Sequence, residues 1–235
     1  MSETLPAPFE WCPIPAGKVT LSDDRQYGGT EGGIFDVPAF SIAKYPVTYA
    51  QFQVFVAEGY ADPQWWGYSA EASMWREAHE QPKVSVIDGV GDYPCGGVSW
   101  YEAVAFCRWL NARLGGVQQV TLPSEQQWQR AAQGDDNRMF PWGNDFDSKR
   151  CNTRESGIGQ TTAATAYPLG ASPFGVVDMS GNIWEWCLTQ WGRDRVDLGS
   201  DSPRCGHGGA YSLSQDDTRV GFRCGVSPSL QIGHI

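Results

Sequence analysis

The chain has 235 residues, enough for one large domain or two small ones with a sizeable core. Its formal net charge of −10 argues against sequence-independent nucleic-acid binding, which needs a basic surface. It contains no apolar run of about 18 residues, and its N-terminal stretch MSETLPAPFEWC lacks the basic and apolar regions of a signal peptide. We therefore expect a cytoplasmic protein with no nucleic-acid partner and no membrane partner.

The first elements in chain order are short strands. The segments IPAGKVTL (14–21) and VPAFSIAKYPV (37–47) are typical of strands around turns. A stretch rich in tryptophan and tyrosine, residues 61–95, follows with no helical periodicity. We interpret it as a loop packed on the core by its own aromatic side chains; the alternative is a docking surface for a partner protein.

Three helix starts share one signature, a Ser or Thr followed three residues later by Glu or Gln. This pair forms a capping box, in which each side chain bonds a backbone N–H at the helix start. Apolar residues at helical spacing follow each box, and glycines end the second and third helices. The boxes are Thr48 with Gln51, Ser99 with Glu102, and Ser124 with Gln127.

The chain after Phe140 is rich in Gly, Pro, Asn, Asp and Thr, and it has no periodic apolar segment before GNIWEWC. Irregular structure of this length is uncommon in a compact domain unless something else orders it, and a bound calcium ion is one such agent. Asp178 and Glu185 around the Gly181-Asn182 turn, or Asn152 and Glu155, are candidate ligands. The alternative is that these are ordinary turn residues.

Other chemistry is poorly supported by the residues alone. Seven cysteines without CxxC spacing indicate reduced, mostly buried thiols and argue against a zinc site. The three histidines form neither HExxH nor HxxxH, and no phosphate-binding or nucleophile motif is present. With no repeat or linker in view, we expect a single α+β domain over residues 1–235 and can assign no reaction.

Seven segments in order resemble the formylglycine-generating enzyme, or sulfatase-modifying factor, family, whose fold is a variant of the C-type lectin fold. The resemblance covers essentially the whole chain. It implies small antiparallel sheets, short helices and much irregular structure. The segments are IPAG (14–17), KYPVTYAQF (44–52), GVSWYEAVAFCRWL (97–110), LPSEQQWQRAAQG (122–134), FPWGN (140–144), DMSGNIWEWC (178–187) and HGGAY (207–211).

The resemblance also implies structural Ca²⁺. One site would use side chains and carbonyls at Asp178, Gly181, Ile183 and Glu185, and all of these positions match the family pattern. A second would use Asn152, Thr153 and the loop from Glu155 to Ile158, where the acidic ligand falls either at Glu155 or at the neutral Ser156. Calcium would order a glycine-rich loop that has too few apolar residues to order itself.

The family's oxygenases bind copper(I) through two cysteines that would fall near Leu213 and Thr218. There is no cysteine between Cys205 and Cys224, and hydroxyl groups cannot replace thiolates as ligands for copper(I). We therefore expect no copper and no enzyme activity. A related sulfoxide-forming branch holds iron with histidines from a helical domain that this chain lacks. The alternative is a copper- or iron-dependent oxidase with relocated cysteines, for which Cys187, Cys205 and Cys224 are the candidates.

The variable proteins of diversity-generating retroelements share this fold and display a diversified C-terminal surface. By this resemblance, residues 207–235 form a ligand-binding region for an unknown protein or other ligand, rich in small polar residues and poor in long charged ones. The alternative is a plain surface on a degenerate enzyme. The expected binding residues are Tyr211, Ser212, Leu213, Ser214, Gln215, Asp217, Val226, Ser227, Ser229, Gln231 and His234.

Three further expectations concern the same end of the chain. Arg219 and Arg223 match arginines of the family motif, and we expect both to be buried structural donors. His207 stands where the motif usually carries Arg. The family's spacing calls for a closing Gly-Phe-Arg strand immediately after Ile235, the last residue of the sequence, so either that strand is missing or the fold closes differently.

Overall fold

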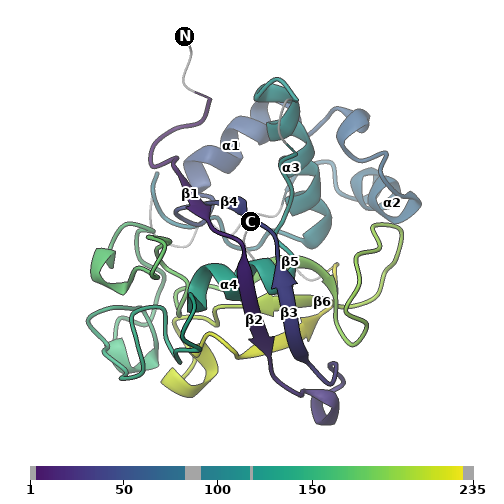
Figure 1. The fold of residues 1–235 in the computed structure, drawn as a ribbon. Coiled ribbons are helices and arrows are strands. Elements are labelled where there is room, and N and C mark those ends of the chain that lie inside the picture. Colours follow the sequence, from purple (N-terminus) through teal and green to yellow (C-terminus); the bar gives the residue numbers. More distant parts are fainter. Residues whose placement is uncertain (1–3, 83–90, 117–118, 230–235) are drawn as a thin grey trace.

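A computed structural model describes residues 4–82, 91–116 and 119–229 of the chain. It combines α-helices with small antiparallel sheets, as the sequence predicts (Figure 1). No helix in these three ranges is long and apolar enough to cross a membrane. The helices are α1 (Tyr49–Glu58), α2 (Ala70–Ala78), α3 (Trp100–Arg113) and α4 (Glu125–Gln133), with 3₁₀ turns at Arg25–Tyr27, Pro63–Trp65, Arg154–Ser156, Pro168–Gly170 and Gln215–Thr218.

All three predicted capping boxes are present. Each cap hydroxyl accepts from a backbone N–H three residues on, and the Gln or Glu side chain there accepts from the cap's own N–H. At α3, the Ser99 N–H donates to Glu102 Oε2 at 2.8 Å. The boxes fix where α1, α3 and α4 begin, because they satisfy donors that a helix start leaves without partners.

Helix α2 is the element that the sequence analysis missed. It lies within the aromatic stretch interpreted as a loop, and it begins at Ser69, whose hydroxyl accepts from the Ala72 N–H at 3.1 Å. The aromatic side chains do pack on the core: Trp66 is 1% exposed and donates to the Tyr60 carbonyl at 3.0 Å.

The strands form two two-stranded sheets and one three-stranded sheet. All pairings are antiparallel, in the orders β1-β4, β2-β3 and β5-β6-β7. In Figure 1, α1, α2 and α3 gather in one half of the molecule, while α4 lies among the strands of the other half. The strands are β1 (Trp11–Ile14), β2 (Gly17–Leu21), β3 (Gly33–Val37), β4 (Phe40–Ala43), β5 (Glu185–Gln190), β6 (Arg204–His207) and β7 (Arg223–Val226).

The position of β7 corrects the expectation about the closing strand. The Gly-Phe-Arg motif is Gly221, Phe222 and Arg223, and it leads directly into β7, which pairs with β6 from Arg204 opposite Val226 to His207 opposite Arg223. The sheet therefore closes within the described residues, and the expectation of a closing strand after Ile235 was wrong.

Two tryptophans join α3 to the three-stranded sheet across the core. Trp100 is fully buried, and its Nε1 donates to the Cys187 carbonyl at 3.0 Å. In the opposite direction, Trp186 Nε1 donates to the Val98 carbonyl at 2.9 Å. These bonds satisfy both indole N–H groups inside the core, so the long loop from Phe140 to β5 is attached to a rigid framework at its end.

Candidate functional site

A tight turn before β5 brings together the residues of the first predicted calcium set. Asp178, Gly181 and Asn182 all have positive φ, at 70°, 81° and 62°. A Cβ at Gly181 would lie 2.2 Å from the Asn152 carbonyl oxygen, so only glycine fits there. The turn therefore takes its shape from backbone conformations that most side chains would disfavour.

Asn182 is the hub of this turn, a role that the sequence analysis did not assign. Its Nδ2 donates to Asp178 Oδ2 at 2.6 Å and to the Thr162 carbonyl at 3.1 Å, and its Oδ1 accepts from Asn152 Nδ2 at 3.0 Å. Its carbonyl accepts from the Tyr211 N–H at 3.1 Å. One fully buried amide thus links three irregular segments. The only sequence signal was its place in a Gly-Asn turn.

Two carboxylates flank the turn in sequence, Asp178 before it and Glu185 after it. Asp178 Oδ1 is buried and has no hydrogen-bond partner among the described residues, while Glu185 Oε2 accepts from Trp128 Nε1 at 2.8 Å. A Cβ at Gly208 would lie 3.6 Å from the Ile183 carbonyl oxygen and 3.7 Å from Glu185 Oε1, so these two oxygens face the same small space.

Burial raises the pKa of both acids. Desolvation raises the pKa of Asp178 well above its ordinary value, and the nearby Glu185 charge raises it further. Desolvation raises the pKa of Glu185 to about 7, although the hydrogen bond from Trp128 lowers it in part. The Glu185 side chain also lines a pocket. His207 lies opposite Glu185 in the β5–β6 ladder, but among the described residues neither carboxylate forms a salt bridge, so a bound cation would stabilise the pair.

The donor set fits a hard cation. It offers carboxylate oxygens from Asp178 and Glu185 and carbonyls from Gly181 and Ile183, and the orphaned Asp178 Oδ1 is available as a ligand. The Gly181 carbonyl also accepts from the Ile183 N–H at 2.7 Å, so it would be shared between this bond and a cation. Within the described residues no group of three or more His, Cys, Asp or Glu side chains could hold a metal. That finding is compatible with this set, because half of its ligands are backbone oxygens.

The second predicted set is not assembled in the same way. Asn152 Oδ1 accepts from the Ser156 hydroxyl at 3.1 Å, and Glu155 Oε1 accepts from the Gln215 N–H at 3.0 Å. The Thr153 carbonyl also accepts from Ser156 at 2.7 Å, and Ile158 is 43% exposed. These oxygens bind protein donors and hold the 152–156 turn against the C-terminal loop.

Residues 211–217 lie in the first part of the predicted binding region 207–235, and we call them the recognition loop. Their backbone is anchored. Besides the Tyr211 bond to Asn182 and the Gln215 bond to Glu155, the Leu213 carbonyl accepts from the Arg154 N–H at 2.9 Å. Ser214 Oγ donates to Asp217 Oδ2 at 2.6 Å, which closes the loop on itself. Within the part of the chain that the structure describes, the side chains of Tyr211, Ser212, Leu213 and Gln215 make no hydrogen bond.

The predicted binding residues differ in their access to solvent. Ser212 and Ser229 are exposed, and Val226 is 5% exposed within the core, so its assignment to a binding surface was wrong. Val226 is buried because it lies in β7 opposite Arg204 and faces the α3 core. Gln231 and His234 lie outside the described residues. The partly exposed members are Tyr211, Leu213, Ser214, Gln215, Asp217 and Ser227.

The two arginines of the C-terminal motif have different roles. Arg223 is buried and pairs with Glu125 and Asp24, which confirms its expected role as a structural donor. Arg219 has a 48% exposed side chain paired with Asp216, so the expectation of burial was wrong. It follows a 3₁₀ turn at the surface, whereas Arg223 begins a strand. His207 is fully buried and stacks on Trp128 at 4.5 Å between ring centroids.

No cysteine replaces the expected copper-binding pair. Thr218 is fully buried, with its hydroxyl donating to the Gln215 carbonyl at 3.2 Å. Of the three candidate thiols, Cys187 and Cys205 lie buried in the sheet core and Cys224 is partly exposed. Desolvation raises the pKa of all three, which disfavours the thiolate that copper(I) requires.

Comparisons with known proteins identify the fold and the family. A family model described as a sulfatase-modifying factor enzyme 1-like domain matches residues 6–235. The hercynine oxygenase of Mycolicibacterium smegmatis is 31% identical over 65% of this chain but only 38% of its own length. The formylglycine-generating enzyme of Bos taurus is 26% identical over 92% of this chain and 74% of its own length.

Two solved structures have the same fold. PvdO from Pseudomonas aeruginosa has a TM-score of 0.72 at 20% identity, and the match covers 99% of this chain and 94% of PvdO. Treponema denticola variable protein 1 has a TM-score of 0.66 at 20% identity, with 94% and 90% coverage. The similar proteins thus include both named enzymes and a variable protein.

Proposed function

This chain belongs to the sulfatase-modifying factor family, and we propose that within it the protein is a non-catalytic binder. It would display a recognition loop, residues 211–217, on a calcium-stabilised lectin-like scaffold. Tyr211, Ser212, Leu213 and Gln215 would contact the ligand, with Ser214, Asp217, Ser227 and Ser229 nearby.

The observation that supports this proposal is that the backbone of the loop is hydrogen-bonded to the scaffold while several of its side chains are not. Backbone bonds to Arg154, Glu155 and Asn182 hold the chain in place. Three polar side chains of the loop, those of Tyr211, Ser212 and Gln215, make no hydrogen bond among the described residues. A fixed backbone with uncommitted side chains tolerates substitution at those positions, because little of the scaffold depends on them.

By the family resemblance, the oxygenase cysteines would fall near Leu213 and Thr218, and the residues found there support a role without copper. A leucine side chain has no atom that can coordinate a metal, and the Thr218 hydroxyl already donates to the Gln215 carbonyl. Calcium would be held by Asp178 and Glu185 with the carbonyls of Gly181 and Ile183. Its chemistry would be structural, because it would neutralise two buried carboxylates beneath the recognition loop.

The experiment that tests this proposal is to sequence the gene from many independent isolates of one population. We expect amino-acid changes concentrated at codons 211–217, with few at the buried codons 204–209 just upstream as the internal control. An even spread of changes, or none in the loop, would remove the support for a diversified surface.

A second assay tests the opposing reading directly. The copper-loaded protein is incubated with oxygen, a thiol reductant that supplies the two electrons needed to reduce the second oxygen atom to water, and a cysteine-containing sulfatase peptide, and the peptide is followed by mass spectrometry. We expect no oxidation of the cysteine to formylglycine. If the product forms, and a Cys205→Ser, Cys224→Ser double variant abolishes it, then the protein is an oxidase and not a simple binder.

A further inference from the structure

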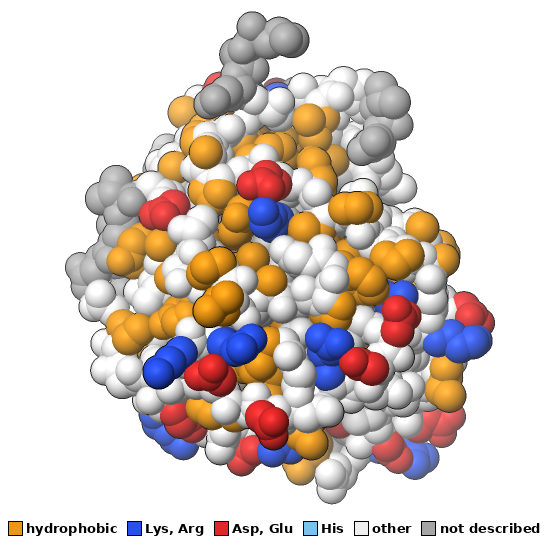
Figure 2. Space-filling view, turned by 60° about the vertical axis from the view of Figure 1, so that its left-hand side comes forward, with side chains coloured by type: hydrophobic (Ala, Val, Ile, Leu, Met, Phe, Trp, Pro, Cys, Tyr) orange, Lys and Arg blue, Asp and Glu red, His pale blue; other side chains and the backbone are white. Residues whose placement is uncertain are grey.

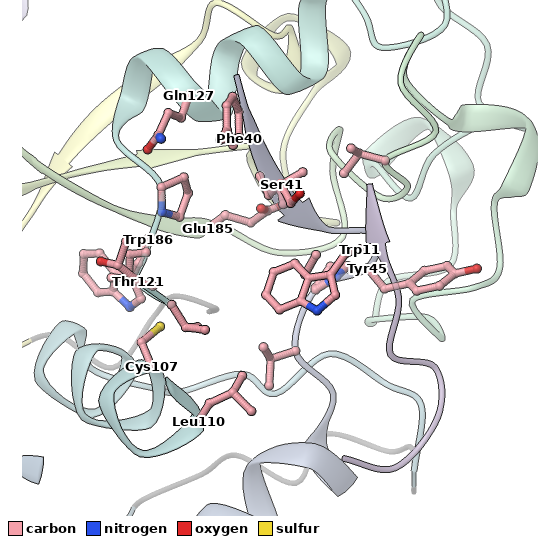
Figure 3. Close-up of a pocket in the computed structure, with 18 of the residues that line it drawn as sticks. Trp11, Phe40, Ser41, Tyr45, Cys107, Leu110, Thr121, Gln127, Glu185 and Trp186 are labelled. Carbon is pink, nitrogen blue, oxygen red and sulfur yellow. The ribbon is translucent and has the colours of Figure 1, made fainter. Parts of the chain in front are cut away.

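A pocket of about 550 Å³ lies far in sequence from the recognition loop. It opens between β1, β4, α3 and the segment 119–123, and none of its lining residues belongs to the C-terminal region 207–229. Phe106 and Leu110 of α3 and Trp186 of β5 contribute apolar walls, while Phe40, Ser41 and Thr121 lie on opposite sides of it (Figure 3). Its volume is within the range of ligand-binding sites.

The edge of β4 faces this pocket. Five consecutive residues, 39–43, line it. Alternate side chains of a strand point to opposite faces, so five consecutive lining residues mean that the pocket meets the strand along its edge. Beyond the pocket wall, β4 is paired only with β1 in a two-stranded sheet.

The register shows which backbone groups point into the pocket. The Lys44 N–H donates to the Glu10 carbonyl at 2.9 Å, so the alternating pattern turns the N–H and C=O of Ser41 and Ala43 away from β1. Pro13, opposite Ser41, fits this pattern because it has no N–H to give. Among the described residues, no partner bonds the backbone of Ser41 or Ala43.

The opposite wall is also extended chain. Residues 119–123 are without helical or strand assignment, and five consecutive positions again line the pocket. Along the β4 side, five residues at about 3.4 Å each leave room for roughly four residues of extended peptide. The pocket therefore has the outline of a slot beside an open strand edge.

Charge narrows the class of ligand. Glu185 is the only Asp, Glu, Lys or Arg among the residues that line the pocket, and its side chain points into the space between Ser41 and Trp186 in Figure 3. No Lys, Arg or His is among the described residues that line the pocket, so the charge of an anionic ligand would be buried without a partner. On the face shown in Figure 2, hydrophobic side chains are scattered mainly over the upper and middle parts, and most charged ones gather in the lower part. Trp11, which lines the pocket, is 42% exposed.

We propose that this pocket binds an extended peptide segment with apolar side chains and no acidic residue, which adds to β4 as a third strand. The backbone of the peptide bonds the free N–H and C=O groups of Ser41 and Ala43. Its inward side chains lie against Phe106, Leu110 and Trp186. Main-chain bonds supply affinity and the apolar walls supply selectivity, as in other cases of strand addition.

The probe is a fluorescein-labelled, acetylated and amidated hexapeptide, Lys-Val-Leu-Val-Leu-Lys, titrated with the full chain and followed by anisotropy. We expect saturable binding with a dissociation constant below about 1 mM. Two N-methylated versions, modified at the second and fourth or at the third and fifth amides, keep every side chain. At least one version should bind about 5-fold or more weakly, because alternate amides face the strand edge.

A matched pair of variants locates the peptide on β4. Ser41→Pro removes one outward N–H without touching the bonds to β1, whereas Ser41→Ala removes only the side-chain hydroxyl. We expect weaker binding by about 5-fold or more for the proline variant and unchanged binding for the alanine variant. Circular dichroism and melting temperature check that both variants fold.

Three results would overturn the proposal. One is the absence of saturable peptide binding. Another is equal binding by the parent peptide and both N-methylated forms, which indicates adsorption to an apolar surface. The third is equal binding by the two Ser41 variants when both are folded. In the first case, binding of an environment-sensitive apolar dye would show that the pocket accepts small molecules instead of a peptide strand.

Discussion

Removing calcium should make the stability of this protein depend on pH through Glu185. The carboxyl group is desolvated beside Asp178, and burial raises its pKa from 4.5 to about 7 when no cation is present. The metal-free folded state then holds a proton that the unfolded chain releases at lower pH. This carboxyl therefore contributes stability fully below about pH 4.5, and its contribution is lost as the pH rises to about 7.

The magnitude follows from the two pKa values. The difference between 4.5 and about 7, at roughly 1.4 kcal/mol per pH unit, amounts to about 3 kcal/mol. Most of this change falls between pH 5 and pH 8. Burial raises the pKa of Asp178 as well, so that residue adds to the loss in the same direction. Bound calcium holds both carboxyl groups ionised and should flatten the profile.

The assay is urea unfolding of the metal-free protein at several pH values from 5 to 8, repeated with millimolar calcium. Glu185→Gln keeps an oxygen that can accept from Trp128 but does not titrate, so its metal-free profile should lose about 3 kcal/mol of pH dependence. Glu77→Gln, at an exposed helix position, is the matched control and should follow the wild type. If Glu185→Gln and wild type give parallel metal-free profiles, the reasoning about this site is wrong.

Two further predictions concern the scaffold. Arg223→Met should lower the free energy of unfolding in urea by about 3–5 kcal/mol, because Glu125 stays buried without its cation. Arg219→Met, at an exposed ion pair, should change it by no more than about 0.5 kcal/mol. Equal losses in the two variants would contradict this reasoning. Gly209→Ala should lower the melting temperature more than Gly157→Ala. Both glycines have positive φ, but only a Cβ at Gly209 would meet a backbone oxygen, Asp217 O at 2.7 Å. Equal shifts in melting temperature would show that the loop relaxes freely.

The parts of the fold that local chemistry decides were predictable from the sequence. A capping box such as Ser99 with Glu102 states where a helix begins through contacts only three residues apart, and all three boxes form as expected. Helix α2 was missed because its nine residues bury only Ala72, so no apolar periodicity announces it. Its stability comes from packing beside Trp66, which local sequence does not reveal.

The parts that depend on distant contacts were less predictable. Arg219 and Arg223 are four residues apart in the sequence, yet only Arg223 is buried, because it forms ion pairs there with Glu125 and Asp24 from other parts of the chain. The role of Asn182 and the open edge of β4 also depend on segments far apart in sequence. The spacing rule that placed a closing strand after Ile235 failed because it overlooked the Gly-Phe-Arg motif that starts at Gly221.

The proposed calcium site and the proposed recognition loop are joined by one residue. The Asn182 side chain bonds Asp178, a candidate calcium ligand, and its carbonyl accepts from Tyr211, the first residue of the loop. A change in the charge of Asp178 therefore acts on a group that also positions the loop backbone. A structural cation at this turn would therefore suit a binding protein. The loop side chains could vary while the Asn182 carbonyl stays in place, because its position depends on the turn and not on the molecule that the loop binds.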